Sequence, residues 1–548
     1  MQFEGRVERP VSRSALASVG VACVLISLAF GVRAFSLQVS RGEEYASISK
    51  NNTLEESIIF AARGVIFDRT GREIAWNEPQ LEDEASLGSS SAGDQAIKAR
   101  AFALRAYTTL PGLAHVLGFI QYPKADARGS WWREIYKPVS GAELAFDSTL
   151  AGVNGARMVE RNARGEIERE NIVAPAKDGS DLALSIDAEV QSRLHRLLSS
   201  HAEKQGFKGG AAVIMDVKTG EIIALTSFPE YDNQGFAEGD AGAVRAAYAD
   251  SATPLLDRAV SGLYAPGSIV KPIFAAAALA EGIISPDKKI LSTGAITIPN
   301  PYDPEHPSIY RDWTVHGWVD MREALAVSSD EYFYTIGGGY GGQVGLGIAR
   351  IDEYARLFGL GEITGIALEG ESAGVIPTPE WKEKIFGAGD PWRIGNTYHT
   401  AIGQYGFQVT PLQAVRFAAA IANGGKLLKP QLVISASPEY TETGIPDGHL
   451  AIVREGMRMA VTSTRQDATV KSLYIPAIDI SAKTGTAQIG THNQYMNSWS
   501  IGFWPSDHPR YAYAVVLEKA PAGTLSGAAP AMRPFFEWLA SAHPEYIQ

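Results

Sequence analysis

An uncharged apolar run near the N-terminus places the strongest constraint on how this chain can fold. The run reads ALASVGVACVLISLAFGV and extends from Ala15 to Val32. Its length of about 18 residues is close to the minimum for a helix that crosses a membrane. We therefore expect a transmembrane anchor at residues 15–35 after a short polar tail at residues 1–14. A cleaved signal peptide and a buried core helix are the alternatives, but no small-residue cleavage site ends the run.

Composition excludes several other classes of protein. The formal net charge is −12 and no basic run appears, so we expect no nucleic-acid partner. The single cysteine, Cys23, excludes an intrachain disulfide. The chain has 548 residues, 45% of them hydrophobic, and can therefore bury a large core. No group of His and Cys residues has the spacing of a zinc site.

The pattern after the apolar run predicts an α+β fold. Short strand-like pieces predominate up to about residue 180, with a turn signal at Asp68–Gly71 between two apolar runs. From residue 181 onward longer helical and strand-like segments alternate. One predicted helix has four apolar residues on a single face: Val190, Leu194, Leu197 and Leu198.

The tripeptide Lys-Thr-Gly occurs twice, and the first copy is best explained as a turn. Lys218–Gly220 lies between the apolar runs GGAAVIMDV and EIIALTSF, which is the pattern of a β-hairpin. Glycine is favoured there because it accepts a positive φ. Glu221 follows directly and makes the position a poor site for an anion.

The second copy is the chemical candidate. Lys483-Thr484-Gly485 lies in AIDISAKTGTAQI, which alternates as a strand does and places Thr484 and Thr486 on one face. Gly485 marks a point where a ligand or another backbone comes close. Two hydroxyls beside a lysine form an edge that can bind a carboxylate.

Ser268 and Lys271 begin a long apolar segment, LYAPGSIVKPIFAAAALAEGI. Pro272 fits a helix only in its first turn, so the pattern predicts a buried helix with Ser268 at its N-terminus. The i, i+3 spacing places Lys271 beside Ser268, and burial should lower the pKa of this lysine. A neutral Lys271 could accept the Ser268 proton, and the Ser268 and Thr486 N–H groups could form an oxyanion hole. The alternative is a helix cap with a lysine that reaches the surface.

A third candidate, Ser328-Ser329-Asp330, follows a helix-like segment in VDMREALAVSSDEYFYTIGG. Ser and Asp are favoured N-cap residues, so one interpretation is a helix that begins at Ser328 or Ser329. The functional interpretation gives Ser328 a proton-relay role toward a leaving amine. Asp330 would then orient neighbouring polar groups.

Taken in order, Ser268-x-x-Lys271, Ser328-x-Asp330 and Lys483-Thr484-Gly485 resemble the motif set of the penicillin-recognising serine enzymes. RGVIFDRTGREIA, LLDRAVSGLYAPGSIVKP and VTPLQAVRFAAAIANGG are also similar to class B penicillin-binding proteins. HGWVDMREALAVSSDEYFY and PWRIGNTYHTAIGQ look more like the elongation type, penicillin-binding protein 2, than the division type. The resemblance extends over nearly the whole chain from the anchor onward.

This resemblance implies a D,D-transpeptidase that cross-links peptidoglycan stem peptides. It implies an extended, mainly β pedestal with a shortened head at residues 36–180 and a penicillin-binding transpeptidase domain at residues 181–548, whose antiparallel sheet is flanked by helices. Ser268 would attack the penultimate D-alanine carbonyl, and an amine of a neighbouring stem peptide would then accept the acyl group. The other implied roles are base for Lys271, orientation and proton handling for Ser328, Asp330 and Lys483, and carboxylate binding for Thr484, Gly485 and Thr486.

The resemblance also implies the surroundings of the protein. The substrate lies outside the cytoplasmic membrane, which puts the tail inside and the catalytic domain outside. A membrane-embedded glycan polymerase of the shape and division family is the implied partner, met through the anchor and pedestal. β-Lactams are the expected inhibitors and should acylate Ser268. No nucleotide or redox cofactor is implied.

Three features depart from the family pattern. The segment between Asn77 and AYTTLPGLAHVLGF is about 30 residues long, the size of a long loop, where relatives carry a larger head. Gly403-Gln404-Tyr405-Gly406 stands where relatives usually have Gly-Gln-Gly. Ser329 occupies a position where some elongation-type relatives have a metal-binding cysteine. We therefore expect no metal site, although His316 and several acids are nearby.

Two other functions stay open at this stage. A serine β-lactamase or β-lactam sensor shares the three motifs but not the match of RGVIFDRTGREIA to the pedestal. A non-catalytic scaffold for a glycan polymerase would not need the Ser268 hydroxyl, so the intact motif set argues against it. About 140 residues separate the anchor from the transpeptidase domain, which leaves little room for a glycosyltransferase domain.

Overall fold

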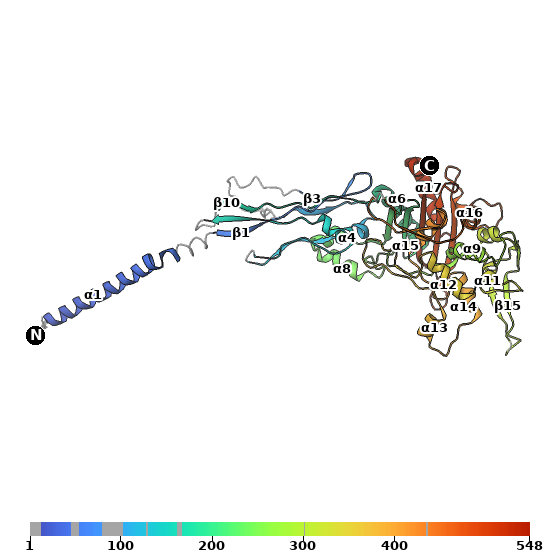
Figure 1. The fold of residues 1–548 in the computed structure, drawn as a ribbon, viewed down its shortest axis with the longest axis horizontal. Coiled ribbons are helices and arrows are strands. Elements are labelled where there is room, and N and C mark those ends of the chain that lie inside the picture. Colours follow the sequence, from blue (N-terminus) through green and yellow to red (C-terminus); the bar gives the residue numbers. More distant parts are fainter. Residues whose placement is uncertain are drawn as a thin grey trace, which may run out of the picture. The chain divides into compact units, whose positions relative to one another are not determined.

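The computed structural model describes residues 12–44, 54–78, 102–127, 130–161, 167–300, 302–434 and 437–547. The chain divides into two compact units, and Figure 1 labels the main helices and strands of each. The first comprises Met1–Ala61 with Gly152–Asp178, and the second Ala62–Ala151 with Gly179–Gln548.

The first unit contains one long helix and a small sheet. Helix α1 (Arg13–Phe35) runs on as a short π-helix, η1 (Ser36–Ser40), and has no buried residue. In the described part of the chain it is the one helix long and apolar enough to cross a membrane, as expected for an anchor. The sheet is antiparallel with the order β1-β9-β10. Its strands are β1 (Leu54–Ile59), β9 (Gly155–Arg161) and β10 (Ile167–Ala174).

The second unit begins with short strands and helices. Its first sheet has the order β11-β2-β3-β4, with β11 (Leu182–Ala183) parallel to β2. The predicted turn at Asp68–Gly71 is confirmed: it joins β2 and β3, and the Asp68 carboxylate accepts hydrogen bonds from the Thr70 and Arg72 N–H groups. The elements of this part are β2 (Ile66–Phe67), β3 (Glu73–Glu78), β4 (Leu104–Tyr107), α3 (Ala114–Leu117), β5 (Ile120–Gln121), β6 (Lys124–Ala125), β7 (Trp131–Arg133), β8 (Lys137–Pro138), α4 (Gly141–Ala145) and α5 (Asp147–Leu150).

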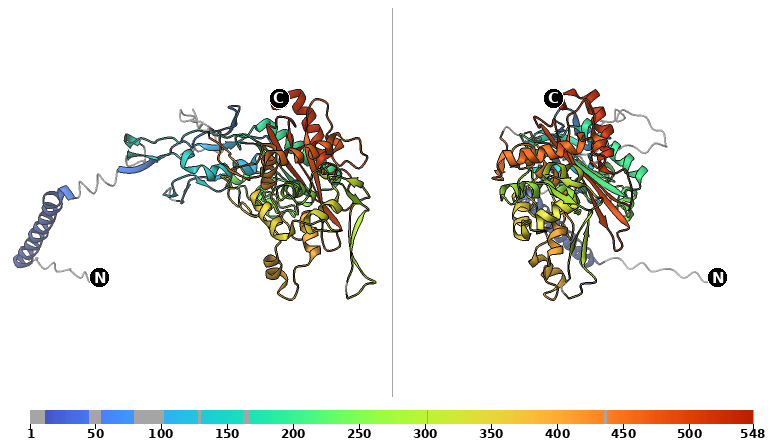
Figure 2. Two further views of the ribbon diagram at one scale, coloured as in Figure 1. Left: turned by 45° about the vertical axis from the view of Figure 1, so that its right-hand side comes forward. Right: turned by 90° about the vertical axis from the view of Figure 1, so that its right-hand side faces the viewer.

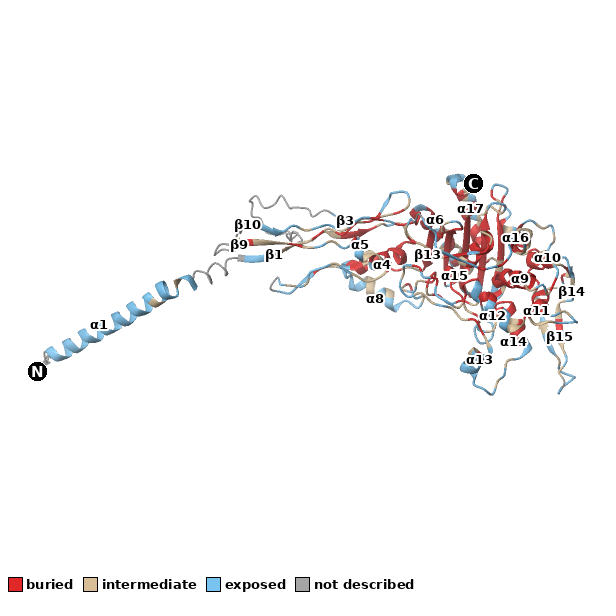
Figure 3. Ribbon diagram, in the orientation of Figure 1, coloured by how far each residue is buried: buried red, intermediate tan, exposed pale blue. Residues whose placement is uncertain are grey.

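A five-stranded antiparallel sheet forms the centre of the second unit, in the order β13-β12-β22-β21-β20. Its strands are β12 (Gly209–Asp216), β13 (Ile222–Phe228), β20 (Ser481–Ile489), β21 (Tyr495–Trp504) and β22 (Tyr511–Pro521). Strand β20 is an edge strand and contains the second Lys-Thr-Gly. Buried residues concentrate in this sheet and in the helices against it (Figure 3).

Helices cover both faces of this sheet, as the α+β prediction requires. Successive residues of β12 alternate between two core clusters, since side chains of a strand point to opposite faces. Val213 packs with α9 (Lys271–Ala280) and α15 (Pro411–Ala422) on one face. Ile214 packs on the other face with α6 (Ala188–Gln205) and α17 (Ala528–Ala542), whose red ribbon lies beside the sheet in Figure 2.

The remaining elements surround this core. The prediction for α6 is confirmed: Val190, Leu194 and Leu198 are buried and Leu197 packs at the edge of the cluster. The other elements are α7 (Asn233–Glu238), α8 (Ala241–Ala249), η3 (Gly267–Val270), β14 (Ile290–Ser292), β15 (Ala295–Ile298), β16 (Ser308–Arg311), β17 (Gly317–Val319), α10 (Met321–Val327), α11 (Asp330–Gly338), α12 (Gly347–Leu357), α13 (Pro379–Phe386), α14 (Ile394–Ala401), β18 (Lys426–Leu428), β19 (Tyr440–Glu442), α16 (Asp447–Thr462), η4 (Lys471–Leu473) and η5 (Pro544–Tyr546).

Candidate active site

Ser268 lies at the entry to the buried helix α9. The helix itself begins at Lys271, and Ser268 is part of the short 3-10 helix η3 that leads into it. Every residue from Lys271 to Leu279 is buried, so the predicted apolar helix is confirmed. Pro272 lies in the first turn, where its missing N–H removes no helical hydrogen bond. Ser268 is half-buried and lines a cleft.

Three glycines allow the turn of Ser268 to contact its neighbours. A Cβ atom at Gly485 would lie 2.6 Å from the Pro266 carbonyl oxygen, and one at Gly403 would lie 2.2 Å from the Gly267 oxygen. Gly267 itself has a φ of 56°, which favours glycine. The close approach expected at Gly485 is therefore confirmed. It places strand β20 and its Lys-Thr-Gly motif directly against the turn that carries Ser268.

Two lysine amines meet at the hydroxyl of Ser328. Lys483 Nζ is 2.8 Å from Ser328 Oγ, and Lys271 Nζ is 3.4 Å from the same oxygen. Both lysines are fully buried. Residues 271, 328 and 483 are far apart in the chain, and the fold brings them to one point beside η3.

The surroundings of Lys271 are more polar than the sequence pattern predicts. Its amine donates to the Ser328 carbonyl oxygen at 2.7 Å and forms an ion pair with Asp330 at 2.6 Å. The apolar residues of α9 surround the stem of the side chain, and the amine lies 5.3 Å from the centre of the Phe333 ring. The sequence pattern could not show this, because Asp330 comes from the start of α11.

Lys483 is the lysine whose charge is disfavoured. Burial lowers the pKa of Lys483 well below its usual value, and the positive charge of Lys271 lowers it further. Two ammonium groups that share one buried hydroxyl would repel each other. The arrangement therefore suits one proton shared between the two amines across Ser328.

Both interpretations of the Ser-Ser-Asp motif apply, each to a different serine: Ser329 caps a helix, and Ser328 lies at the two lysine amines. Ser329 is the N-cap of α11, and its hydroxyl accepts a hydrogen bond from the Tyr332 N–H at 3.2 Å. Ser328 ends α10 in the left-handed conformation, with a φ of 59°. Non-glycine residues seldom adopt this conformation, and such backbone strain is typical of functional sites.

A cleft of about 1130 Å³ opens in front of these groups. Ser268, Ser328, Asp330, Thr484 and Thr486 all line it. Gly485 lies between the two threonines on the same edge strand. Other side chains that line the cleft come from distant segments: Arg311, Trp313, Tyr334, His399, Lys471 and Thr524.

Other copies of these short motifs in the described residues do not line the cleft. Lys218–Gly220 forms the turn of the β12–β13 hairpin, where the Asp216 carboxylate accepts from two N–H groups and Gly220 has a φ of 80°. A further Ser-x-x-Lys, Ser285–Lys288, lies in the loop between α9 and β14. Ser47–Lys50 lies outside the described residues.

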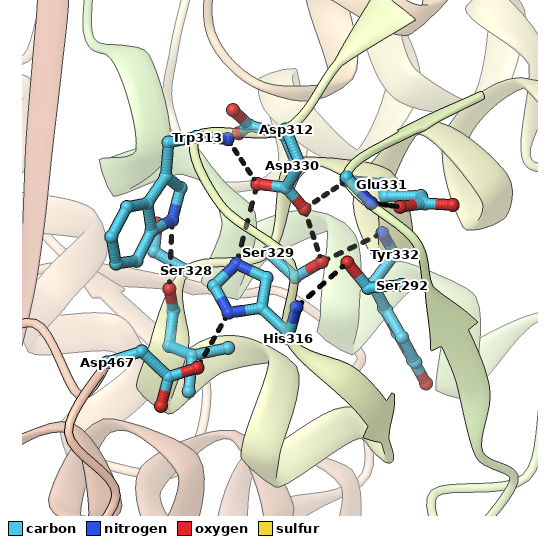
Figure 4. Close-up of polar contacts among 12 residues, drawn as sticks. Ser292, Asp312, Trp313, His316, Ser328, Ser329, Asp330, Glu331, Tyr332 and Asp467 are labelled. Atoms are coloured by element: carbon cyan, nitrogen blue, oxygen red, sulfur yellow. Dashed lines mark hydrogen bonds and ion pairs between the residues drawn. The ribbon is translucent and has the colours of Figure 1, made fainter. Parts of the chain in front are cut away.

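Sequence reasoning missed one polar cluster beside the cleft (Figure 4). His316 lies between the carboxylates of Asp312 and Asp467, and Asp312 in turn accepts a hydrogen bond from Ser329. His316 was the only visible signal, because Asp467 is distant in the sequence. Across the described residues no group of three or more His, Cys, Asp and Glu residues has the arrangement of a metal site.

Comparison with known families agrees with this geometry. The family described as "Penicillin binding protein transpeptidase domain" matches residues 210–537, and "Penicillin-binding Protein dimerisation domain" matches residues 85–184. The chain is 30% identical over 502 residues to the peptidoglycan D,D-transpeptidase MrdA of Haemophilus influenzae. That alignment covers 84% of this chain and 73% of the relative.

Solved structures give the same result. The chain is similar to Pseudomonas aeruginosa PBP2 in complex with WCK 5153, with 26% identity, a TM-score of 0.69, and coverage of 90% of this chain and 98% of that one. It is also similar to a chain in the work described as "Structural coordination of polymerization and crosslinking by a peptidoglycan synthase complex". The identity there is 27%, the TM-score is 0.71, and coverage is 97% of this chain and 98% of that one.

Proposed function

The chain belongs to the penicillin-binding protein transpeptidase family and is a D,D-transpeptidase of the elongation type, and from this premise we propose that Ser268 is the residue acylated by peptidoglycan stem peptides. The observation that carries the proposal is the meeting of two lysine amines at the Ser328 hydroxyl, beside the turn of Ser268.

The first step makes Lys271 a base. Lys271 passes a proton to Ser328 Oγ while the Ser328 hydroxyl proton moves to the neutral amine of Lys483. The lowered pKa of Lys483, caused chiefly by burial and then by Lys271, is what keeps this amine neutral beforehand. Lys271 is then neutral and accepts the Ser268 proton as the serine oxygen attacks.

The second step forms and breaks bonds at the substrate. Ser268 Oγ bonds to the carbonyl carbon of the penultimate D-alanine, and the oxyanion accepts hydrogen bonds from the N–H groups of Ser268 and Thr486. The C–N bond to the terminal D-alanine then breaks. The amine of the released D-alanine receives the proton of the Ser328 hydroxyl. The charged Lys483 then gives a proton back to Ser328. A serine ester remains.

The third step transfers the acyl group to an acceptor amine. The amine of a neighbouring stem peptide attacks the ester and passes a proton through Ser328 to Lys483, which is neutral at this point. Ser268 leaves with the proton that Lys271 holds, and the proton on Lys483 then returns through Ser328 to Lys271. The new amide is the cross-link. Asp330 keeps Lys271 oriented through the 2.6 Å ion pair during these exchanges.

Strand β20 supplies the substrate-binding edge. Because it is the edge of the five-stranded sheet, an extended peptide can pair with the backbone groups on its outer side. Thr484 and Thr486 line the cleft on either side of Gly485 and would hold the terminal carboxylate of the stem peptide. A β-lactam would occupy the same place and acylate Ser268.

The division of the chain and its location are part of the proposal. The segments are a cytoplasmic tail (1–14), an anchor (15–35), a pedestal with a shortened head (36–180) and an extracytoplasmic transpeptidase domain (181–548). The apolar helix α1 supports the anchor. The match to the dimerisation domain favours a penicillin-binding protein over a β-lactamase, which has no need of a pedestal.

The proposed partner is a membrane-embedded glycan polymerase. The similar chain described with a peptidoglycan synthase complex supports it, because polymerisation and crosslinking are coordinated in that assembly. Co-purification of the full chain from membranes should recover such a polymerase. Recovery of the chain without any polymerase under mild detergent would count against this partner.

Labelling with a fluorescent penicillin tests the assignment of Ser268. The full chain in detergent should form an adduct that lasts for many minutes, and Ser268→Ala should form none. Ser285→Ala is the matched control, because Ser285 has the same Ser-x-x-Lys spacing but lies in an exposed loop. Loss of the label from wild type within seconds would favour a β-lactamase. A folded wild type that takes no label would favour a non-catalytic scaffold for a glycan polymerase.

A further inference from the structure

A buried cluster of charges joins two walls of the cleft. Asp312 lines the cleft, whereas His316, Arg465 and Asp467 lie behind its lining. The His316 side chain is fully buried between two carboxylates. Its Nδ1 lies 2.8 Å from Asp467 Oδ2, a hydrogen-bond distance, and its Nε2 lies 3.5 Å from Asp312 Oδ1, a charge contact. Figure 4 shows the imidazole between these two acids.

The charge on the ring follows from its neighbours. Burial lowers the pKa of His316, but the negative charges of Asp312 and Asp467 and the hydrogen bond to Asp467 outweigh burial and raise it. The pKa values of Asp312 and Asp467 fall to about 2. Arg465 faces the same cluster and contacts Asp467 at 2.8 Å. Two carboxylates thus meet two cations, which is the arrangement that a buried set of charges requires.

One side of the cluster holds the Ser-Ser-Asp turn. Asp312 Oδ2 accepts a hydrogen bond from Ser329 Oγ at 2.8 Å and another from the Glu331 N–H at 2.9 Å. These are the groups on either side of Asp330, the partner of Lys271. The residue after Asp312 adds a further contact, because the Trp313 indole N–H donates to the Val327 carbonyl oxygen at 3.2 Å, next to Ser328.

The other side of the cluster holds the segment before η4. Asp467 binds both His316 and Arg465, and Arg465 also donates to the His316 carbonyl at 2.9 Å. The next residues, Ala468 and Thr469, line the cleft, and the Thr469 N–H donates to the Ala326 carbonyl at 3.2 Å.

We propose that His316 is a positioning residue for transpeptidation, which clamps the Ser328–Asp330 turn to the wall formed by residues 465–472 through Asp312 and Asp467. The clamp holds Ser328 in its left-handed conformation and keeps its hydroxyl between the two lysine amines. His316 contacts no reacting atom. Its effect is on the geometry of the proton relay and therefore on the rate of bond formation at Ser268, a step that is sensitive to displacements of about 1 Å.

His316→Gln in the full chain tests this proposal, which rests on the proposed function. Glutamine keeps a hydrogen bond to Asp467 but carries no charge. The acylation rate constant with a fluorescent penicillin should fall about tenfold or more, because the relay is misplaced. The dissociation constant of the noncovalent penicillin complex should change by less than about twofold, because β20 binds the ligand carboxylate and is not part of the clamp.

A second variant and a matched control separate the clamp from general damage. Asp467→Asn, at a partly exposed side chain, should lower the rate constant as His316→Gln does, and the double variant should be no worse than either single one. His306→Gln is the control, because His306 forms an exposed ion pair with Asp303 and should leave the rate constant unchanged.

The outcomes distinguish a failure of the clamp from a failure of the proposed function. If wild type takes no label at Ser268, the proposed function fails. If wild type is labelled and both His316→Gln and Asp467→Asn acylate within twofold of it, the clamp is wrong. An equal loss of binding and rate, or additive losses in the double variant, would also overturn the clamp, since it predicts a coupled effect on rate alone.

Discussion

At the scale of single residues, Ser328 has two separable roles. Its hydroxyl lies between the amines of Lys271 and Lys483. Its backbone ends α10 with a φ of 59°, a conformation that glycine adopts more readily than any residue with a Cβ. In the proposed mechanism the hydroxyl serves the proton transfer, whereas the backbone conformation sets its position at the expense of stability.

Two substitutions at Ser328 separate these roles. Ser328→Ala and Ser328→Gly both remove the hydroxyl, so both should lower the acylation rate constant by about a hundredfold, the range of a lost proton-transfer group. Their stabilities should differ, since the left-handed backbone costs a residue with a Cβ, such as alanine, about 1–2 kcal/mol that glycine does not lose. Stopped-flow acylation and thermal unfolding measure the two effects. A Ser328→Gly variant that acylates at the wild-type rate would exclude the relay.

At the scale of elements, the site depends on how closely β20 packs against η3. Lys483 and Ser268 come from these two elements, and Gly485 is the position of closest approach. The Pro266 oxygen, the Ile269 side chain and the Ile269 N–H all lie within 3.2 Å of a Cβ placed there. Backbone atoms cannot move aside as a flexible side chain can, so any side chain must push the strand away from the turn.

Gly485→Ala should therefore damage catalysis more than stability. An added methyl in a packed region costs about 1–3 kcal/mol, whereas a shift of about 1 Å between Lys483 and Ser268 should slow acylation about a hundredfold. Gly389→Ala is the control, because nothing lies within 4 Å of its Cβ position and no positive φ restricts it. Acylation kinetics and unfolding midpoints of both variants decide the question. A Gly485→Ala variant that acylates at the wild-type rate would show that the close contact between β20 and η3 is not needed.

At the scale of the whole molecule, the sequence predicted contacts that depend on local order and missed contacts that depend on the fold. The β2–β3 turn, the turn at Lys218–Gly220 and the buried face of α6 follow from short patterns and are confirmed. The comparisons also confirm the family, the α+β fold class and the transpeptidase activity that the ordered motifs implied.

The missed contacts join charges across long stretches of chain. Lys271 meets Asp330, and His316 meets Asp467 over 151 positions. Such pairs leave no periodic signal, because each partner alone looks like an ordinary polar residue in a loop or at a helix start. The motif could identify Lys271, but only the packed structure shows an acid beside its amine.

Buried ionisable groups away from the cleft should make stability depend on pH. His115 in α3 and His195 in α6 are both buried, and burial lowers the pKa of each to about 4. In an unfolded chain both have a pKa of about 6.5. Between these values the unfolded state binds more protons than the folded state, so the free energy of unfolding must fall as the pH falls from 6.5 to 4. Each histidine can lower the free energy of unfolding by at most about 3 kcal/mol in this pH range.

Asp257 has the opposite effect in the same range. Burial raises its pKa to about 6, from an ordinary value near 4, so the folded state binds the extra proton and gains stability as the pH falls. Two histidines outweigh one aspartate, and the full chain should lose stability between pH 6.5 and 4.5. His195→Gln should flatten the dependence of the unfolding midpoint on pH, whereas Asp257→Asn should make it steeper. Parallel curves for wild type and both variants would show that these groups do not set the acid sensitivity of the fold.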